Sequence, residues 1–226
     1  AAAVSASIIF AQFSMQDALN YLIDYEFKKM SHEDVRVALR DPADPEVLAE
    51  IGNLPHMTLE EPQLSVVCDM TNGPHKKRVG VQALPADNRL YTPLDRSGEP
   101  ISIPREGLVL TEKLAEILDL RTGDTVRMRP LLGERREVTA PVVSTIDTYL
   151  GLSAYADLRY LSDLLGEERV VNAVLGKLQP GAPEGPMLKE LKELQSIVGV
   201  EQRSRALNRL EESFGETNRI MIVMGI

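Results

Sequence analysis

The chain has 226 residues, with 34 acidic against 25 basic side chains, a formal charge of -9, one cysteine, no tryptophan and four phenylalanines. This acidic excess argues against a nucleic-acid-binding surface, which depends on clustered Lys and Arg. A single cysteine excludes an internal disulfide and any zinc module built on several cysteines. With 43% hydrophobic and 26% charged residues, the composition is that of a folded protein of one large or two small domains.

Both ends of the chain are apolar. No charged residue occurs from Ala1 to Gln16, and residues 220–226 after Arg219 are uncharged as well. Each run is shorter than the about 20 apolar residues that a membrane span requires. We interpret them as the end of one span and the start of another. Two alternatives stay open: a signal peptide at the first end, although its positively charged beginning is absent, and terminal segments that dock on their own domain.

Between these ends, hydrophobic periodicity and turn residues predict a mixed order of helices and strands. In chain order the patterns predict a helix over 14–29, a strand over 35–39, a helix over 45–52, strands over 64–70 and 78–84, a loop-rich passage over 84–105, a strand over 107–110, a helix over 112–120, strands over 125–129 and 137–146, a helix over 155–165, a strand over 170–178, a helix over 187–197, a strand over 198–203 and a helix from 207 onward.

Local signals support several of these boundaries. Asp44 and Pro45 are typical of a helix start, and Asn72-Gly73 favours a hairpin turn between the second and third strands. Two β-α-β pieces, over 34–70 and 170–203, flank a β-rich middle. If these pieces pack together, the middle of the chain projects as a second subdomain.

Residues of the types that carry chemistry are scattered. The histidines His32, His56 and His75 have no second ligand at metal-site spacing. Ser153 lacks the second glycine of a nucleophile elbow, and we expect it to cap the following helix. Cys68 lies in an alternating strand, where a thiol acts as a small hydrophobic side chain.

Two further patterns have a structural interpretation as well. The adjacent carboxylates at 60–61 and 167–168 diverge in any regular element, so we expect solvated surface there. Neither GxGxxG nor GxxxxGK[ST] occurs to bind phosphate. The sequence therefore predicts no catalytic, cofactor or metal residues.

One local basic cluster stands out in this acidic chain. It consists of Arg127, Arg129, Arg135 and Arg136, around the turn of a predicted β-hairpin. A solvated face is the simpler interpretation, and a surface for an acidic partner or anionic headgroups is the functional one.

The passage from Gly107 to Val126, Gly-Leu-Val-Leu-Thr-Glu-Lys-Leu-Ala-Glu-Ile-Leu-Asp-Leu-Arg-Thr-Gly-Asp-Thr-Val, resembles a known family. It is similar to the strand, helix and G-D-x-V passage in the extracytoplasmic domains of MacB/FtsX-type ABC transporter permeases. The segments 147–161, 171–178 and 198–201 follow in the order seen there. The similarity covers about residues 20 to 226, and the order of elements contributes more to it than any single motif.

The resemblance implies an α+β fold in which the β-α-β pieces from both chain ends form a Porter-like α/β subdomain, with a β-rich Sabre-like subdomain inserted between them. The implied division, in chain order, is a transmembrane-helix end with a juxtamembrane helix (1–30), the first Porter-like half (31–84), the Sabre-like insertion (85–166), the second Porter-like half (167–206) and a helix leading into the next transmembrane span (207–226).

The implied function is non-catalytic. The domain would lie on the periplasmic side of the inner membrane and couple ATP-driven motion of transmembrane helices to substrate export, lipid or lipoprotein extraction, or signalling. Its implied partners are an ABC ATPase subunit or domain, a second permease copy, and a periplasmic adaptor or lipid or lipoprotein cargo, with no cofactor and no nucleic acid. The alternative is a soluble ligand- or partner-binding α+β module, and an enzyme is less favoured because no motif supplies its chemistry.

Overall fold

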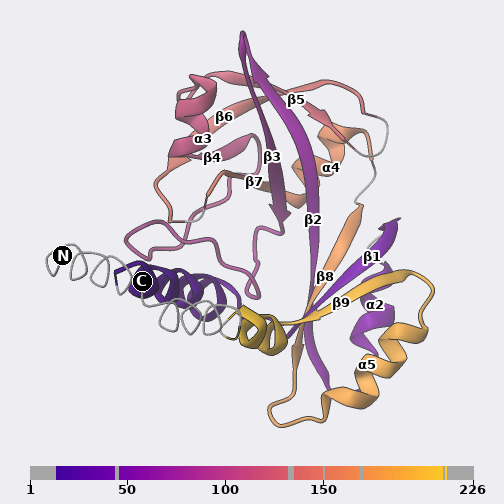
Figure 1. Cartoon of the computed structure of the whole chain (residues 1–226). Coiled ribbons are helices and arrows are strands. Elements are labelled where there is room, and N and C mark those ends of the chain that lie inside the picture. Colours follow the sequence, from indigo (N-terminus) through magenta and orange to yellow (C-terminus); the bar gives the residue numbers. More distant parts are fainter. Residues whose placement is uncertain are drawn as a thin grey trace, which may run out of the picture.

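The computed structural model describes residues 14–43, 46–131, 135–149, 151–167, 170–210 and 212 (Figure 1). A helix over 14–24 continues into the π-helix η1 (Tyr25–Met30). The other elements are β1 (Val35–Ala43), α2 (Glu46–Gly52), β2 (Met57–Asn72), β3 (His75–Leu84), β4 (Leu108–Thr111), α3 (Glu112–Leu118), β5 (Thr125–Pro130), β6 (Val138–Ile146), β7 (Ser153–Asp157), α4 (Leu158–Leu165), β8 (Val171–Leu178), α5 (Glu184–Glu193), β9 (Ile197–Gln202) and a helix over 203–210.

The strands form one hydrogen-bonded system with two parts that share the long strand β2 (Figure 1). In the first part, the strands of the two β-α-β pieces interleave in the order β2-β8-β1-β9, and all of these neighbours are antiparallel. In the second part, the pairings run from β2 through β3, β7, β4, β6 and β5 and return to β2. The expected α+β fold, with a β-rich middle inserted between two β-α-β pieces, is confirmed.

The two parts meet where β2 changes partners. Its first half pairs with β8 up to Gln63, and its pairing with β5 begins at Cys68. Asn172 fills part of the gap: its Oδ1 accepts the N–H of Ser65 at 2.9 Å, and its Nδ2 donates to the Ser65 carbonyl at 2.7 Å. The amide side chain thus replaces the backbone pairing that a neighbouring strand would supply.

Alternation of apolar residues explains why these strands share a core. In β5 every second side chain is buried, and β4 is buried throughout because it lies between β6 and β7. One large apolar cluster extends through both parts of the sheet. A second cluster joins η1 to the loop-rich passage and to the sheet, through Tyr25, Met30, Leu84, Leu90, Tyr91, Leu94, Val109, Tyr155 and Leu175.

Two local expectations were wrong. Residues 155–157 belong to strand β7, not to the helix that follows, and Asp157 caps α4 by accepting the N–H groups of Arg159 and Tyr160. Ser153 therefore does not cap this helix. The strand is buried on both faces between β3 and β4, so its apolar run lacks the alternation that separates strand from helix.

The predicted hairpin is present, with a different loop. Asn72 pairs with His75, so the two loop residues are Gly73 and Pro74 rather than Asn72 and Gly73. Gly73 has a φ of 53°, and proline fixes a negative φ at the next position, which suits a two-residue hairpin loop.

Some expectations lie outside the described residues. They are the apolar runs 1–13 and 220–226 and the helix start at Asp44 and Pro45. Among the helices within the described ranges, none is long and apolar enough to cross a membrane. The residue boundaries of the implied subdomains stay a prediction.

Candidate functional site: the junction of the terminal helices

The helix at each end of the described chain enters the fold at one junction (Figure 1). The N-terminal one ends in the π-turn η1, where the N–H of Ser31 donates to the carbonyl of Glu26 at 2.9 Å. In an α-helix that N–H would bond to the carbonyl of Phe27 instead. The wider turn therefore leaves the Phe27 carbonyl available to another donor, and π-turns of this kind often occur at functional sites.

Arg203, the first residue of the C-terminal helix, supplies that donor. Its Nη1 donates to the Phe27 carbonyl at 2.8 Å, and its Nη2 lies 3.4 Å from Oδ1 of Asp34. Its backbone N–H donates to the Asp34 carbonyl at 3.0 Å. Arg203 thus joins the end of the first helix, the start of β1 and the start of the last helix. We call this set of contacts the Arg203 clamp.

Asp34 is itself held from the sheet. Its carboxylate accepts the N–H of Leu178 and lies 3.0 Å from Nζ of Lys177, both on β8. Burial alone would raise the pKa of Asp34, but these donors together with Arg203 lower it below its ordinary value. The carboxylate is therefore ionised at neutral pH, as the clamp requires.

A second contact joins the N-terminal helix to the β-rich part. The hydroxyl of Tyr25, a residue only 1% exposed, donates to the carbonyl of Leu94 at 2.8 Å and also contacts the carbonyl of Asp95. Its ring meets Tyr149 edge to face at 5.4 Å between centroids, and Tyr21 packs against both rings. Burial raises the pKa of Tyr25, so its hydroxyl stays a donor at physiological pH.

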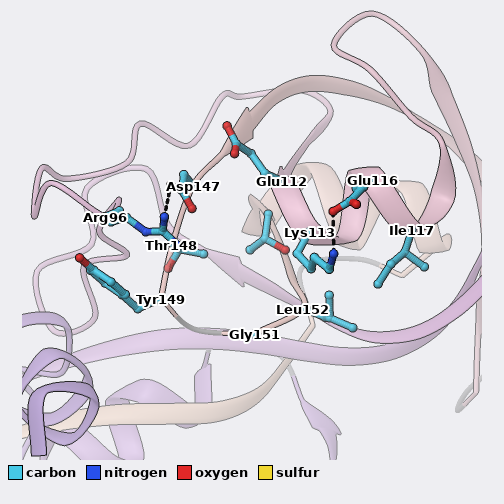
Figure 2. Close-up of a pocket in the computed structure, with 11 residues that line it drawn as sticks. Arg96, Glu112, Lys113, Glu116, Ile117, Asp147, Thr148, Tyr149, Gly151 and Leu152 are labelled. Carbon is cyan, nitrogen blue, oxygen red and sulfur yellow. Dashed lines mark hydrogen bonds and ion pairs between the residues drawn. The ribbon is translucent and has the colours of Figure 1, made fainter. Parts of the chain in front are cut away.

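A cavity of about 660 Å³ opens beside this tyrosine cluster (Figure 2). Tyr149 lines one side, where Arg96 lies over its ring and forms a 3.0 Å ion pair with Asp147. On α3, Lys113 pairs with Glu116 at 2.7 Å. Figure 2 shows these two ion pairs on opposite sides of the cavity. Because its charges are largely paired with one another, the cavity offers no convergent set of groups for one ligand.

The structure brings only part of the predicted basic cluster, Arg127 and Arg129, to the outer face of the second part of the sheet, whereas Arg135 and Arg136 line a hollow with Leu165 and Asn172. Arg127 and Arg129 are exposed on β5, and Arg135 and Arg136 are exposed in the segment before β6. Arg127 lies 3.7 Å from Glu137, both about half exposed, so this pair contributes little. A role of the predicted basic cluster in binding a partner stays a prediction.

The structure adds two basic residues that the sequence analysis missed. On β2, Asp69 is opposite Arg129 on one side and Arg78 on the other, and the next outward position, Thr71, is opposite Arg127 and Lys76. Hydrogen bonds from Arg78 and Lys76 lower the pKa of Asp69 to about 2. The hairpin register is the signal that could have found them, because it sets which side chains share a face.

The other residues weighed in the sequence stay apart. The described residues contain no group of three or more His, Cys, Asp or Glu suited to a metal. Cys68 is buried, and burial raises the pKa of its thiol to about 12, so it is a poor nucleophile. Glu61 contradicts the expected solvated surface: it is 7% exposed and accepts the N–H groups of Arg89 and Leu90. It is buried because the loop-rich passage needs acceptors for these groups.

No family model matches the chain, and no curated protein sequence matches it. Solved structures similar to it include the periplasmic region of MacB from Actinobacillus actinomycetemcomitans, with 11% identity, a TM-score of 0.49, and coverage of 84% of this chain and 97% of that one. Another is the extracellular domain of the noncanonic ABC-type transporter YknZ from Gram-positive bacteria, with 11% identity, a TM-score of 0.44, and coverage of 79% and 94%. Both solved structures are domains that lie outside the cytoplasm.

Proposed function

We propose that the chain is a non-catalytic extracytoplasmic domain of a MacB/FtsX-type ABC transporter permease. The observation that carries the proposal is the junction, where the Arg203 clamp holds both terminal helices. Tyr25 extends this connection to the β-rich part. A domain that passes on movement needs stiff contacts at the points where its helices enter. The junction supplies hydrogen bonds of 2.8 Å from Arg203 and from the buried Tyr25.

In this proposal the two helices continue into transmembrane spans of the inner membrane, and an ABC ATPase drives their movement. The Porter-like and Sabre-like divisions given above are the moving parts. Substrate export, extraction of a lipid or lipoprotein, and signalling are the uses that such movement serves. A second permease copy and a periplasmic adaptor are the further partners.

The chain offers a direct test of location, because its single cysteine is buried. The gene product with its natural flanks, in which any cysteine outside these 226 residues is replaced by serine, is expressed in cells as Lys189→Cys, which places one exposed thiol on α5. A membrane-impermeant maleimide added to cells with a permeabilised outer membrane is expected to label this variant, and to leave the unsubstituted protein unlabelled. After solubilisation in detergent, the protein is expected to co-purify with an ATP-hydrolysing subunit or domain. Labelling only after the inner membrane is lysed would exclude the proposal.

We also propose that the basic face binds an acidic segment of a protein partner. Its cations are Lys76 and Arg78 on β3 and Arg127 and Arg129 on β5. Among the described residues, Asp69 and Glu137 are the carboxylates that form ion pairs with these cations. The β2-β3 hairpin projects away from the described terminal helices (Figure 1), which favours a protein partner over a membrane surface.

The double substitution Arg127→Glu and Arg129→Glu tests this face. Binding of a fluorescent decaglutamate peptide at low salt is expected to weaken by about tenfold or more, because like charges then oppose each other at the surface. The matched control is Arg121→Glu with Arg159→Glu, which makes the same change in net charge at exposed positions elsewhere. Equal weakening in both double variants would mean that only net charge matters.

A further inference from the structure

A small cavity of about 90 Å³ lies directly behind the Arg203 clamp, and some of the polar groups that line this cavity take no part in the clamp. Glu33, between η1 and β1, is only 4% exposed at this cavity. Its Oε1 accepts from Nη2 of Arg36 at 2.8 Å. Its Oε2 is buried without a hydrogen-bond partner among the described residues. A buried carboxylate oxygen in this state is costly, so it indicates that something else binds there.

The charged and titratable groups near the carboxyls of Glu33 and Glu26 come from several elements. They are Glu26 on η1, Arg36 on β1, Tyr91 in the loop-rich passage, Tyr155 on β7, Glu201 on β9 and Arg203 on the C-terminal helix. Glu201 is paired with Arg209, so Glu33 and Glu26 share Arg36 and Arg203, and Arg203 is also bonded to Asp34. Among the described residues, Arg36 is the cation that hydrogen-bonds Glu33, and it reaches only Oε1.

We propose that Glu33 and Glu26 together form a proton-binding site at the junction, and that one bound proton favours the closed Arg203 clamp. The proton-binding site itself does not depend on the proposed function. Only the use of the site rests on that function, because a domain outside the cytoplasm experiences the pH of its surroundings. A proton on Oε2 of Glu33 neutralises this buried carboxylate without enlarging the cavity. The proton also turns an unpaired acceptor into a donor.

The expected direction follows from burial. Burial is the largest influence on both carboxyls and raises the pKa of Glu33 and of Glu26, although Arg36 opposes it. A raised pKa in the folded state means that protonation stabilises the fold at low pH. That stability is lost as the pH rises above about 4.3, the ordinary Glu value, through the higher value in the folded state. The junction is then tighter in mild acid and looser near neutral pH.

Glu33→Gln in the 226-residue chain tests the proposal, because glutamine resembles the protonated form. Hydrogen exchange of the amides over 24–34 is measured from about pH 4.5 to 7.5, after correction for the intrinsic exchange rate. In the unsubstituted chain the opening equilibrium is expected to increase by up to about tenfold per pH unit in this window. In Glu33→Gln most of this increase is expected to be lost, with only the smaller contribution of Glu26 left, and the equilibrium is expected to stay near the level of the acidic state.

The control is Glu201→Gln, which changes a carboxyl at the same cavity that is 56% exposed and paired with Arg209. This variant is expected to keep the pH dependence. A ¹³C-NMR titration of the glutamate carboxyls in the unsubstituted chain measures the site even if the variant folds poorly. A Glu33 carboxyl that titrates at the ordinary value, or a profile that follows Na⁺ or K⁺ at fixed pH, would overturn the proton assignment. Neither measurement uses a membrane or an ATPase, so each can fail or succeed independently of the proposed function.

Discussion

Replacing Tyr25 with alanine is expected to lower the free energy of unfolding by about 4 kcal/mol, because truncation of a buried aromatic side chain leaves a cavity. The ring is 1% exposed and belongs to the apolar cluster that includes Met30, Tyr91 and Tyr155. Its hydroxyl is also the donor to the carbonyl of Leu94. Urea unfolding followed by circular dichroism measures the change.

Two variants separate the ring from the hydroxyl. Tyr25→Phe keeps the ring and is expected to cost about 1 to 2 kcal/mol, because the carbonyl of Leu94 loses its donor. Tyr21→Ala removes the neighbouring ring, which is 43% exposed, and is expected to cost less than about 1 kcal/mol. If Tyr21→Ala and Tyr25→Ala destabilise equally, the N-terminal helix is not anchored through Tyr25.

Through this anchor the N-terminal helix contacts both parts of the sheet. The carbonyls of Leu94 and Asp95 belong to the passage that leads from β3 to β4, so Tyr25 connects the helix to the β-rich part. The Arg203 clamp connects the same helix to β1 and, through Asp34, to β8. Both contacts are made by residues of the π-turn, which also contributes the carbonyl on which the clamp depends.

Local periodicity is sufficient to predict most of the fold. The alternation in β5 follows from Val126 and Met128 pointing inward and Arg127 and Arg129 outward, and the structure has that pattern. The hairpin between β2 and β3 follows from the turn residues. Strand β7 could not be predicted because it is buried on both faces, so burial removes the polar positions that reveal a period of two.

The junction could not be predicted, because its contacts join residues far apart in the chain. Arg203 and the Phe27 carbonyl are 176 positions apart, and the carbonyl is available only because of the π-turn. Nothing in the residues around Arg203 distinguishes it from Arg205 or Arg209 in the same helix. The basic cluster was predicted in part, since neighbours along β5 are visible in the sequence and neighbours across β2 and β3 are not.

Arg203→Met is the second substitution with a large expected effect, a loss of about 2 to 3 kcal/mol in the free energy of unfolding. Methionine retains the apolar stem, so the loss reports the guanidinium. The Phe27 carbonyl loses its charged donor, and Asp34 loses one of its cationic partners. Hydrogen exchange is expected to accelerate at the amides of 26–31 more than in β5, because the first helix loses its connection to the last.

Two further variants separate the effect of the guanidinium hydrogen bonds from the effect of charge alone. Arg203→Lys keeps the charge near Asp34 but cannot bond to it and to the Phe27 carbonyl with one planar fork, so we expect an intermediate loss. Arg209→Met removes a guanidinium from the same helix, where the side chain is 70% exposed and 3.7 Å from Glu201, and is expected to cost less than about 0.5 kcal/mol. If Arg203→Met and Arg209→Met behave alike, the terminal helices are not coupled through Arg203. If only Arg203→Met accelerates exchange in the first helix, the coupling passes through this one side chain, because both variants remove the same charge from the same helix.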